Sequence, residues 1–388
     1  TYRHALTRQL ELRGHQVVPL AMRQPENEPS PWEHRFISWV DMREQRTPQQ
    51  SLRLLPRVLW SREAQRQCRR LIDEYKPDLA HIQHIHRHIT PSILEPLNRA
   101  GIPVIWTVHD YELICPEGHL YAPDGPCTRC SGHRYWEAVR HRCKWGDRMP
   151  SVAAAIEKQV HRMKRVWERI DRFLCPSRFL AEKLVEFGIP REKVIPFPNF
   201  IDVPEPSGPW KPGQGWLYAG RLTEEKGVDV VIEAARELPE HPLWICGTGP
   251  EMERLVLRAR DLKQVRFRGH LPREQLAQFI SEVGAVSVPS RWYENFPYAV
   301  LEAQARRRPV VASRIGGIPE QITDGVDGFL ISPDDPRALA ASIRSILSQP
   351  EKARKIGLAG YHRVRDQLSA RTHMQKLLSL YSQLVDSS

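Results

Sequence analysis

Two glutamates separated by seven residues, Glu294 and Glu302, carry the clearest chemical signal in the sequence. Between them Pro297 marks the expected start of a helix, because proline is tolerated in the first turn of a helix. The backbone N–H groups from Phe296 to Tyr298 would then be free to bind an anion. Carboxylates repel phosphate, but they accept hydrogen bonds from sugar hydroxyls. The segment therefore predicts a ligand that carries both phosphate and sugar, as a nucleotide-sugar does.

A basic element comes earlier in the chain and supports this interpretation. Arg221 and Lys226 follow an apolar run at residues 216–219 that is typical of a strand. Arginine offers a planar fork of donors and lysine a mobile point charge, and both commonly bind a diphosphate. Either element alone is compatible with a surface loop that holds a salt bridge, but their order and spacing favour a diphosphate site. Four residues after other expected strands are predicted on the base or phosphate side of the ligand: Gly247, Gly249, Arg268 and His270.

With these residues, and with His109 in its first half, the chain resembles the retaining family 4 glycosyltransferases of GT-B fold. The resemblance extends over nearly the whole chain. It implies that Arg221 and Lys226 hold the donor diphosphate. It also implies that Glu294 contacts the hydroxyls of the donor sugar and that Glu302 binds the ribose. His109 would lie near the transferred sugar and the acceptor, which makes His109 and Glu294 the expected catalytic residues.

The activity that the resemblance implies is transfer of a sugar from a UDP- or GDP-sugar to a glycan, a lipid-linked or a small-molecule acceptor. Such a reaction serves cell-surface polysaccharide or glycoconjugate synthesis. The implied mechanism is a front-face reaction with retention, in which the leaving phosphate helps to deprotonate the acceptor. No Asp-x-Asp pair suited to a divalent ion is present, so no catalytic metal is expected. The alternatives are a sugar-nucleotide epimerase or phosphorylase of the same fold, and a non-catalytic nucleotide-sugar-binding protein.

The length of 388 residues is enough for two domains. Alternating strand and helix patterns predict an α/β fold with a parallel sheet in each half, as in two Rossmann-like domains facing across a cleft. We expect an acceptor-side domain over residues 1–199 and a nucleotide-sugar-binding domain over residues 200–365. The proline-rich residues 196–204 are the expected hinge. By the resemblance, a last helix in residues 366–388 should return to the N-terminal domain.

The elements that must position these residues can be read from the apolar runs and their breaks. A Rossmann-like half opens with a strand and a Gly-rich turn, but this sequence opens with an amphipathic helix over residues 2–13. We therefore expect the chain to be a truncated piece, and the absence of that turn leaves the activity of the piece open. The expected helices are residues 60–75, 151–170, 177–187 and 228–238. The expected strands are residues 16–21, 79–83, 103–108, 172–176, 216–219, 243–246, 265–268, 285–288, 309–313 and 328–331.

The chain is basic, with a net charge of +11, and most of the excess positive charge lies in its first half. The helix expected over residues 151–170 carries an apolar stripe and a basic stripe. The basic stripe is either a solvated face or a surface that docks on an anionic membrane or a lipid diphosphate acceptor. Nucleic acid is disfavoured, because no aromatic-interleaved basic motif is present. No secretion signal is visible, so we expect a cytoplasmic protein, with the inner face of the membrane as a further location. The apolar stripe is Ile156, Val160, Met163, Trp167 and Ile170, and the basic stripe is Lys158, Arg162, Arg165 and Arg169.

Four of the seven cysteines fall in one Gly- and Pro-rich stretch, residues 112–148. One Cys-x2-Cys pair with two further thiolates can close a tetrahedral zinc site, and such a metal would order an insert that has little core of its own. Unliganded thiols, disulfides and an iron–sulfur cluster remain alternatives. By the resemblance, a similar insert in a subset of the family implies a lid or acceptor-shaping role. The cysteines are Cys115, Cys127, Cys130 and Cys143, and His119, His133 or His141 could replace one of them.

A histidine-rich segment, from His81 to His88, follows an expected strand. Alternation places His84, His86 and His88 on one side of an extended segment, which is compatible with a metal site. The favoured interpretation is the end of a strand and its loop at the cleft, where histidines can meet sugars or phosphates.

Overall fold

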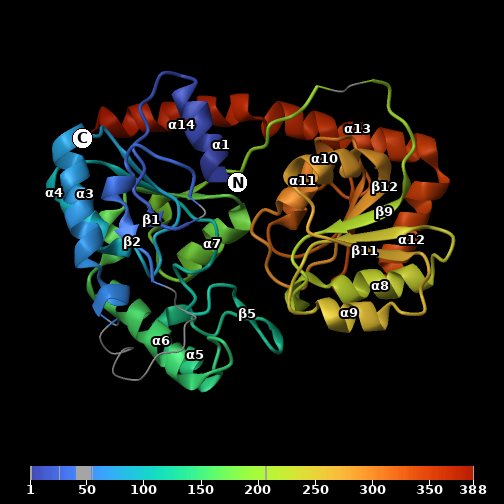
Figure 1. Ribbon diagram of the computed structural model, residues 1–388, viewed down its shortest axis with the longest axis horizontal. Coiled ribbons are helices and arrows are strands. Elements are labelled where there is room, and N and C mark those ends of the chain that lie inside the picture. The colour runs from blue at the N-terminus through green and yellow to red at the C-terminus, as the bar shows by residue number, and fades with distance from the viewer. Residues whose placement is uncertain (1, 26, 41–53, 55, 206–207, 388) are drawn as a thin grey trace.

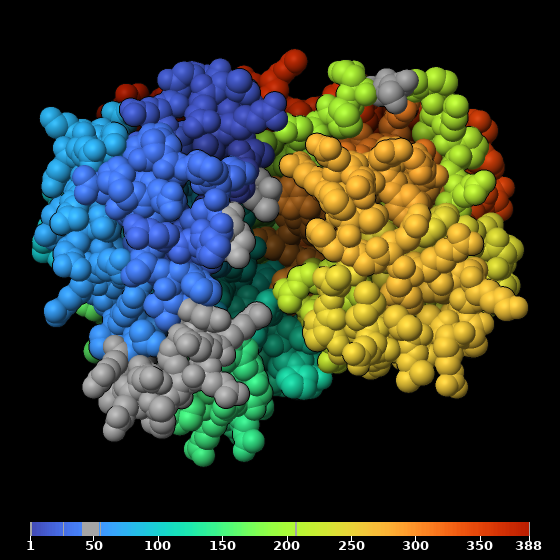
Figure 2. Space-filling model, in the orientation of Figure 1, coloured from blue at the N-terminus to red at the C-terminus, as the bar shows by residue number. Residues whose placement is uncertain are grey.

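Two α/β units, each built on a parallel sheet, make up the computed structural model (Figure 1). The structure describes residues 2–25, 27–40, 54, 56–205 and 208–387. The first unit has a four-stranded sheet in the order β3-β4-β7-β8, and the second has a six-stranded sheet in the order β11-β10-β9-β12-β13-β14. The space-filling view shows the furrow that separates the two units (Figure 2). The prediction of two Rossmann-like domains is thus confirmed.

The strands are short, apolar and mostly buried, as expected where helices cover both faces of a parallel sheet. Those of the first sheet are β3 (Ala80–Ile82), β4 (Val104–Thr107), β7 (Arg172–Cys175) and β8 (Val194–Pro196). Those of the second are β9 (Gln214–Ala219), β10 (Leu243–Cys246), β11 (Val265–Gly269), β12 (Val283–Val288), β13 (Val310–Ser313) and β14 (Phe329–Ile331).

Several helices begin at a side chain that accepts a hydrogen bond from a free backbone N–H group of the first turn, which is the usual way to start a helix. Ser61, Ser177 and Ser369 cap α3, α7 and α14 in this way. The helices of the first unit are α1 (Tyr2–Glu11), α3 (Arg62–Tyr75), α4 (Leu94–Arg99), α5 (Trp136–Arg140), α6 (Arg148–Met163) and α7 (Arg178–Glu186). Those that follow are α8 (Val228–Arg236), α9 (Met252–Arg258), α10 (Arg273–Glu282), α11 (Tyr298–Gln304), α12 (Pro336–Ser348), α13 (Pro350–Gln367) and α14 (Ala370–Val385).

The strand expected over residues 16–21 does not form. In its place β1 (Met22–Arg23) pairs in parallel with β2 (Ile37–Ser38), as a separate two-stranded sheet. Pro19 lies within the expected strand, and a proline cannot donate a hydrogen bond to a sheet. Strand β8 was not expected from the sequence, because it has only three residues and ends in a proline.

The helix expected over residues 151–170 is also wrong in its end and in its buried face. Helix α6 ends at Met163, and Arg165 adopts a left-handed conformation (φ +52°) before a short 3-10 turn begins. The apolar side chains Ile156 and Met163 are exposed, whereas Lys158 of the expected basic stripe is buried. Burial of Lys158 is tolerated because Glu157 lies beside it, with 3.4 Å between Nζ and Oε1. The buried residues of α6 are Ser151, Ala154, Glu157, Lys158 and His161.

The last helix, α14, crosses back to the first unit, where it lies beside α1 (Figure 1). Its Met374 and Leu377 join a buried cluster with Leu6 of α1. The Tyr2 hydroxyl and His373 Nε2 share a hydrogen bond of 3.0 Å. The return of the chain to the first unit is therefore held by apolar packing on the first sheet, which contributes Ile105 and Leu174 to the cluster. Within the residues that the structure describes, no helix is both long and apolar enough to span a bilayer.

Candidate active site

Lys226 and Glu294, from the two sequence elements that predicted a donor site, form a direct ion pair. Lys226 Nζ lies 2.7 Å from Glu294 Oε1. The same oxygen accepts a hydrogen bond of 2.6 Å from Ser290 Oγ. Glu294 is only 5% exposed, so its carboxylate depends on these two partners in place of water. The Lys226 ammonium also lies 4.7 Å from the ring centre of Trp292, within range of a cation–π contact.

The loops that carry these residues pack backbone against backbone. Gly227 has a φ of +66°, and a Cβ there would lie 2.2 Å from the carbonyl oxygen of Pro289. Both the conformation and the close approach thus require glycine directly after Lys226. The N–H of Arg291 donates to the carbonyl of Glu225 (2.8 Å), which ties the same two loops together.

Arg221 follows β9 and is exposed, beside the loop that carries Gly247. A Cβ on Gly247 would lie 1.8 Å from the carbonyl oxygen of Gly220, and Leu222 N–H donates to the Thr248 carbonyl (3.0 Å). A Cβ on Gly249 would lie 2.2 Å from the carbonyl oxygen of Leu222. The predicted glycines therefore allow the loop after β10 to lie directly on the Arg221 loop, which places both at the carboxyl end of the second sheet.

Glu302 lies toward the end of α11, with its side chain largely buried. Burial raises the pKa of its carboxyl group, and the charges of Arg306 and Arg273 partly offset this rise. Among the described residues, no protein group donates a hydrogen bond to the Glu302 carboxylate, which leaves it free to bind a ligand hydroxyl.

The side chains around the start of α11 serve packing. Phe296 is 6% exposed and lies in a buried cluster with Leu301 and Leu368. Tyr298 packs against the cluster that joins α1 to α14. No side chain caps α11. A phosphate at this segment could therefore meet only backbone N–H groups, and Pro297 offers none.

Arg268 and His270, predicted on the base or phosphate side, are both exposed at the end of β11. The Arg268 guanidinium lies 5.5 Å from the ring centre of Phe279 in α10. In the described part of the chain neither residue contacts the Lys226–Glu294 pair, and their place on the base or phosphate side of a ligand stays a prediction.

His109 follows β4 on the facing side of the furrow. Its Nε2 lies 2.8 Å from Gln83 Oε1, and its ring makes an edge contact with Tyr2, with 5.1 Å between ring centres. Burial lowers the pKa of His109 to about 4, although the neighbouring Asp110 opposes the shift. The imidazole is therefore neutral at physiological pH and can accept a proton or a hydrogen bond.

Asn295 joins the two halves of the site, and no sequence pattern singled it out. Its amide Nδ2 donates to the carbonyl of Val108 (3.2 Å), and its Oδ1 accepts from Ser177 Oγ (3.0 Å). Because Asn295 follows Glu294 and Val108 precedes His109, this bridge fixes the two candidate catalytic residues on opposite sides of one interdomain contact.

The cysteine-rich insert reaches the donor side of the furrow. It contains the short hairpin of β5 (Tyr121–Ala122) and β6 (Gly125–Pro126), which lies between the two units (Figure 1). The ring of His119 lies 5.3 Å from that of Trp292, the residue that packs on Lys226. This contact links the insert to the donor-site pair, and Trp292 had no signal in the sequence beyond its place near Glu294.

The four insert cysteines are free thiols that lie near one another. Burial raises the pKa of Cys130 to about 12, and Cys115, Cys143 and Cys127 add to the shift. No three of these four sulfurs, however, lie within 4.8 Å of one another in the described chain. The thiols are thus grouped, but less tightly than zinc ligands at about 2.3 Å from one ion would be.

Comparison with known proteins gives matches over both halves of the chain. The family described as "Glycosyltransferase Family 4" matches residues 1–205, and "Glycosyl transferases group 1" matches residues 211–363. The glycogen synthase of Mycobacterium tuberculosis is 33% identical over 237 residues, which cover 58% of this chain and 57% of the relative. The chain thus spans little more than half the length of that relative.

Three further similarities are more extensive. A "GDP-mannose-dependent alpha-(1-6)-phosphatidylinositol monomannoside mannosyltransferase" of Mycolicibacterium smegmatis is 28% identical over 283 residues, covering 66% of this chain and 72% of the relative. The structure of sucrose-phosphate synthase from Thermosynechococcus elongatus superposes with a TM-score of 0.71 at 21% identity, over 100% of this chain and 93% of that one. HepE from Anabaena, solved in complex with UDP-glucose, gives a TM-score of 0.60 at 17% identity and covers 82% of both chains.

Proposed function

The chain belongs to glycosyltransferase family 4, and from this membership we propose that it transfers a sugar from a nucleotide diphosphate-sugar to a hydroxyl acceptor. The observation that carries the proposal is the buried Lys226–Glu294 pair, held by the Asn295 bridge opposite His109. A cation suited to a diphosphate and a carboxylate suited to sugar hydroxyls are thereby fixed next to a neutral histidine. A UDP- or GDP-linked donor is the proposed class, in line with the GDP-mannose-dependent mannosyltransferase and with HepE in its complex with UDP-glucose.

In the proposed reaction the bond between the anomeric carbon and the diphosphate oxygen breaks, and the acceptor oxygen bonds to that carbon on the same face. Negative charge develops on the leaving diphosphate, where Arg221 and Lys226 would stabilise it. The acceptor proton passes to a leaving phosphate oxygen, so the configuration is retained without a side-chain nucleophile. His109 would accept a hydrogen bond from a sugar hydroxyl, and no divalent ion is assigned to the diphosphate.

Donor binding must rearrange the pair at the centre of the site. Lys226 already has an anionic partner at 2.7 Å, so a diphosphate would compete with Glu294 for the ammonium group. Once the ammonium turns to phosphate, Glu294 Oε1 keeps its Ser290 bond and gains a free position for a sugar hydroxyl. The same competition would couple phosphate binding to sugar recognition.

The test is a thermal-shift panel of UDP-, GDP- and ADP-sugars, followed by an assay of the released nucleotide with sugar acceptors. A rise in melting temperature with one donor, and acceptor-dependent nucleotide release, would support the proposal. Dependence of turnover on inorganic phosphate would instead indicate a phosphorylase, and conversion of the nucleotide-sugar without release of the nucleotide an epimerase. Binding without turnover would indicate a non-catalytic protein.

An exposed apolar face on α6 supports a second part of the proposal, contact with an anionic membrane. Met149 and Met163 are each 73% exposed, and Ile156, on the same side of the helix, is 42% exposed. Exposed basic side chains flank them, among them Arg162 and Lys164. Apolar side chains with flanking cations are typical of helices that lie on anionic lipid surfaces. We infer that this face, rather than the stripe expected from the sequence, docks at the inner face of the cytoplasmic membrane.

Vesicle sedimentation tests this membrane contact. The protein should sediment with vesicles that contain phosphatidylglycerol and much less with phosphatidylcholine alone. The double substitution Met149→Ser/Met163→Ser should reduce binding by about thirtyfold, because each side chain loses roughly 1 kcal/mol of apolar transfer. Leu257→Ser is the matched control, since Leu257 is 62% exposed on α9 of the other unit. Equal binding by the double variant and the wild-type protein would contradict the proposal.

We also propose that the insert cysteines hold one structural zinc ion. The grouping of the thiols around Cys130 supports the proposal, and a bound ion would draw the sulfurs closer together than they lie here. Elemental analysis of purified protein should find zinc, and Cys127→Ser/Cys130→Ser should lower the content by one ion per chain. Retention of all zinc by this variant would show that the thiols are not ligands.

A further inference from the structure

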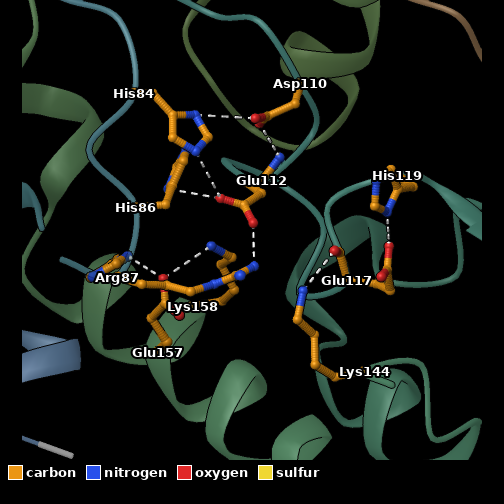
Figure 3. A network of polar contacts seen from close by, with 11 residues as sticks. His84, His86, Arg87, Asp110, Glu112, Glu117, His119, Lys144, Glu157 and Lys158 are labelled. Atoms are coloured by element: carbon orange, nitrogen blue, oxygen red, sulfur yellow. Dashed lines mark hydrogen bonds and ion pairs between the residues drawn. The ribbon is translucent and has the colours of Figure 1, made fainter. Parts of the chain in front are cut away.

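Four side chains outside the donor site converge at the carboxyl edge of the first sheet (Figure 3). His84 and His86 follow β3, and Asp110 and Glu112 follow β4. Strands β3 and β4 are neighbours and pair in parallel, so the loops after them leave the sheet at the same edge. One ligand-type atom from each of the four residues lies within 4.8 Å of those from the others.

Two buried atoms of this cluster have no hydrogen-bond partner. His86 is 8% exposed, and its Nδ1 is unpartnered, as is Oε2 of Glu112. These two atoms lie 4.0 Å apart. A buried polar atom without a partner costs about 1–3 kcal/mol of stability. One shared partner between the two atoms would remove this cost for both.

His84 faces both carboxylates of the cluster and can offer one of its two nitrogens to an ion. Its Nδ1 lies 3.3 Å from Asp110 Oδ2, and its Nε2 lies 3.9 Å from Glu112 Oε2. Ligand atoms at about 2.0–2.2 Å from a tetrahedral metal ion are roughly 3.3–3.6 Å from one another. Two imidazoles with two carboxylates are a donor set that suits zinc and similar divalent ions.

The surroundings orient this set and leave it accessible. Arg87 pairs with Oε1 of Glu112, the oxygen that does not face His86, and so aims Oε2 into the cluster. The His84 side chain is 56% exposed, which opens the cluster to solvent. His88, in the same segment, turns away and bonds the carbonyl of Val40 (2.9 Å).

From this geometry we propose that His84, His86, Asp110 and Glu112 bind a divalent transition-metal ion of the zinc class. The ion lies on the acceptor side of the furrow, next to His109, and is separate from the four insert cysteines and from the donor diphosphate. A single bridging water between His86 Nδ1 and Glu112 Oε2 is the competing explanation, because a water can also satisfy two buried polar atoms.

The test uses the Cys127→Ser/Cys130→Ser variant, so that thiolate-bound metal does not obscure the result. After treatment with a chelator, calorimetric titration with Zn²⁺ should show one site. Adding His84→Ala and Glu112→Gln should weaken that site by about a hundredfold or more, because two of the four ligands are lost. The added glutamine still offers an oxygen to Arg87, and circular dichroism would verify folding.

His88→Ala in the same background is the matched control and should bind Zn²⁺ as tightly as the parent variant. Titration with Co²⁺ gives an independent readout, since a histidine and carboxylate site shows visible ligand-field bands without the near-ultraviolet thiolate bands. Absence of a saturable site in the cysteine variant would overturn the proposal and leave a bridging water only. Equal affinity with and without His84→Ala/Glu112→Gln would overturn it as well.

Discussion

Glu294→Gln is expected to reduce sugar transfer by about a hundredfold or more while the bare nucleotide diphosphate stays bound. The amide keeps the size of the carboxylate and can still accept the Ser290 hydrogen bond. It removes the charge that holds Lys226 at 2.7 Å, so the ammonium no longer has to leave an anionic partner to meet the diphosphate. Affinity for the nucleotide diphosphate should therefore be unchanged or higher, whereas recognition of the sugar is lost.

The partner residue should give the opposite pattern. Lys226→Ala removes a charged hydrogen bond to phosphate, worth on the order of 1.5–3 kcal/mol, so the nucleotide diphosphate should bind about tenfold to hundredfold more weakly. Lys352→Ala is the matched control, since this lysine also lies over a ring, 5.4 Å from the centre of Phe329, but outside the site. Calorimetry of the nucleotide diphosphate and initial rates of transfer measure both effects. A loss of nucleotide affinity in Glu294→Gln as large as that in Lys226→Ala would refute the assigned roles.

Acid is expected to destabilise the protein steeply between pH 6.5 and pH 4. Burial lowers the pKa of His81 to about 3 and the pKa values of His109, His161 and His373 to about 4. Because the folded values lie below the unfolded value, the unfolded chain binds more protons in this range. The stabilisation is complete above pH 6.5 and is lost as the pH falls toward the folded values, at about 1.4 kcal/mol per pH unit for each histidine.

Melting temperatures measured by circular dichroism between pH 7.5 and 4.5 test this dependence. His373→Gln should reduce the slope of melting temperature against pH by the contribution of one titrating group. Substitution of the exposed His362 should leave this slope unchanged. The raised pKa of Glu302 acts in the opposite direction, since its neutral form is favoured in the folded state, but it involves a single group. A melting temperature that stays constant from pH 7 to pH 5 would contradict the prediction.

The sheets and the order of the donor elements followed from the sequence alone. Strands such as β10 and β12 are apolar runs between turn residues. In an α/β protein a short run of this kind is typical of a buried strand of a parallel sheet. The pattern around Pro297 likewise predicted the start of α11, because the constraint that proline places on a helix is local. Local patterns of this kind indicate element type, and for Glu294 they also indicated the site.

Contacts between elements were decided by tertiary structure. The buried face of α6 was predicted wrongly from the sequence, because the surroundings of the helix, and not its period, decide that Glu157 and Lys158 are both buried. The Asn295 bridge depends on how two units meet, which no spacing along one chain records. His86 and Glu112 lie 26 residues apart and converge only because β3 and β4 pair in parallel. The sequence by itself therefore determined the elements and the donor-site residue types, whereas the pairing of strands and domains determined which side chains share a site.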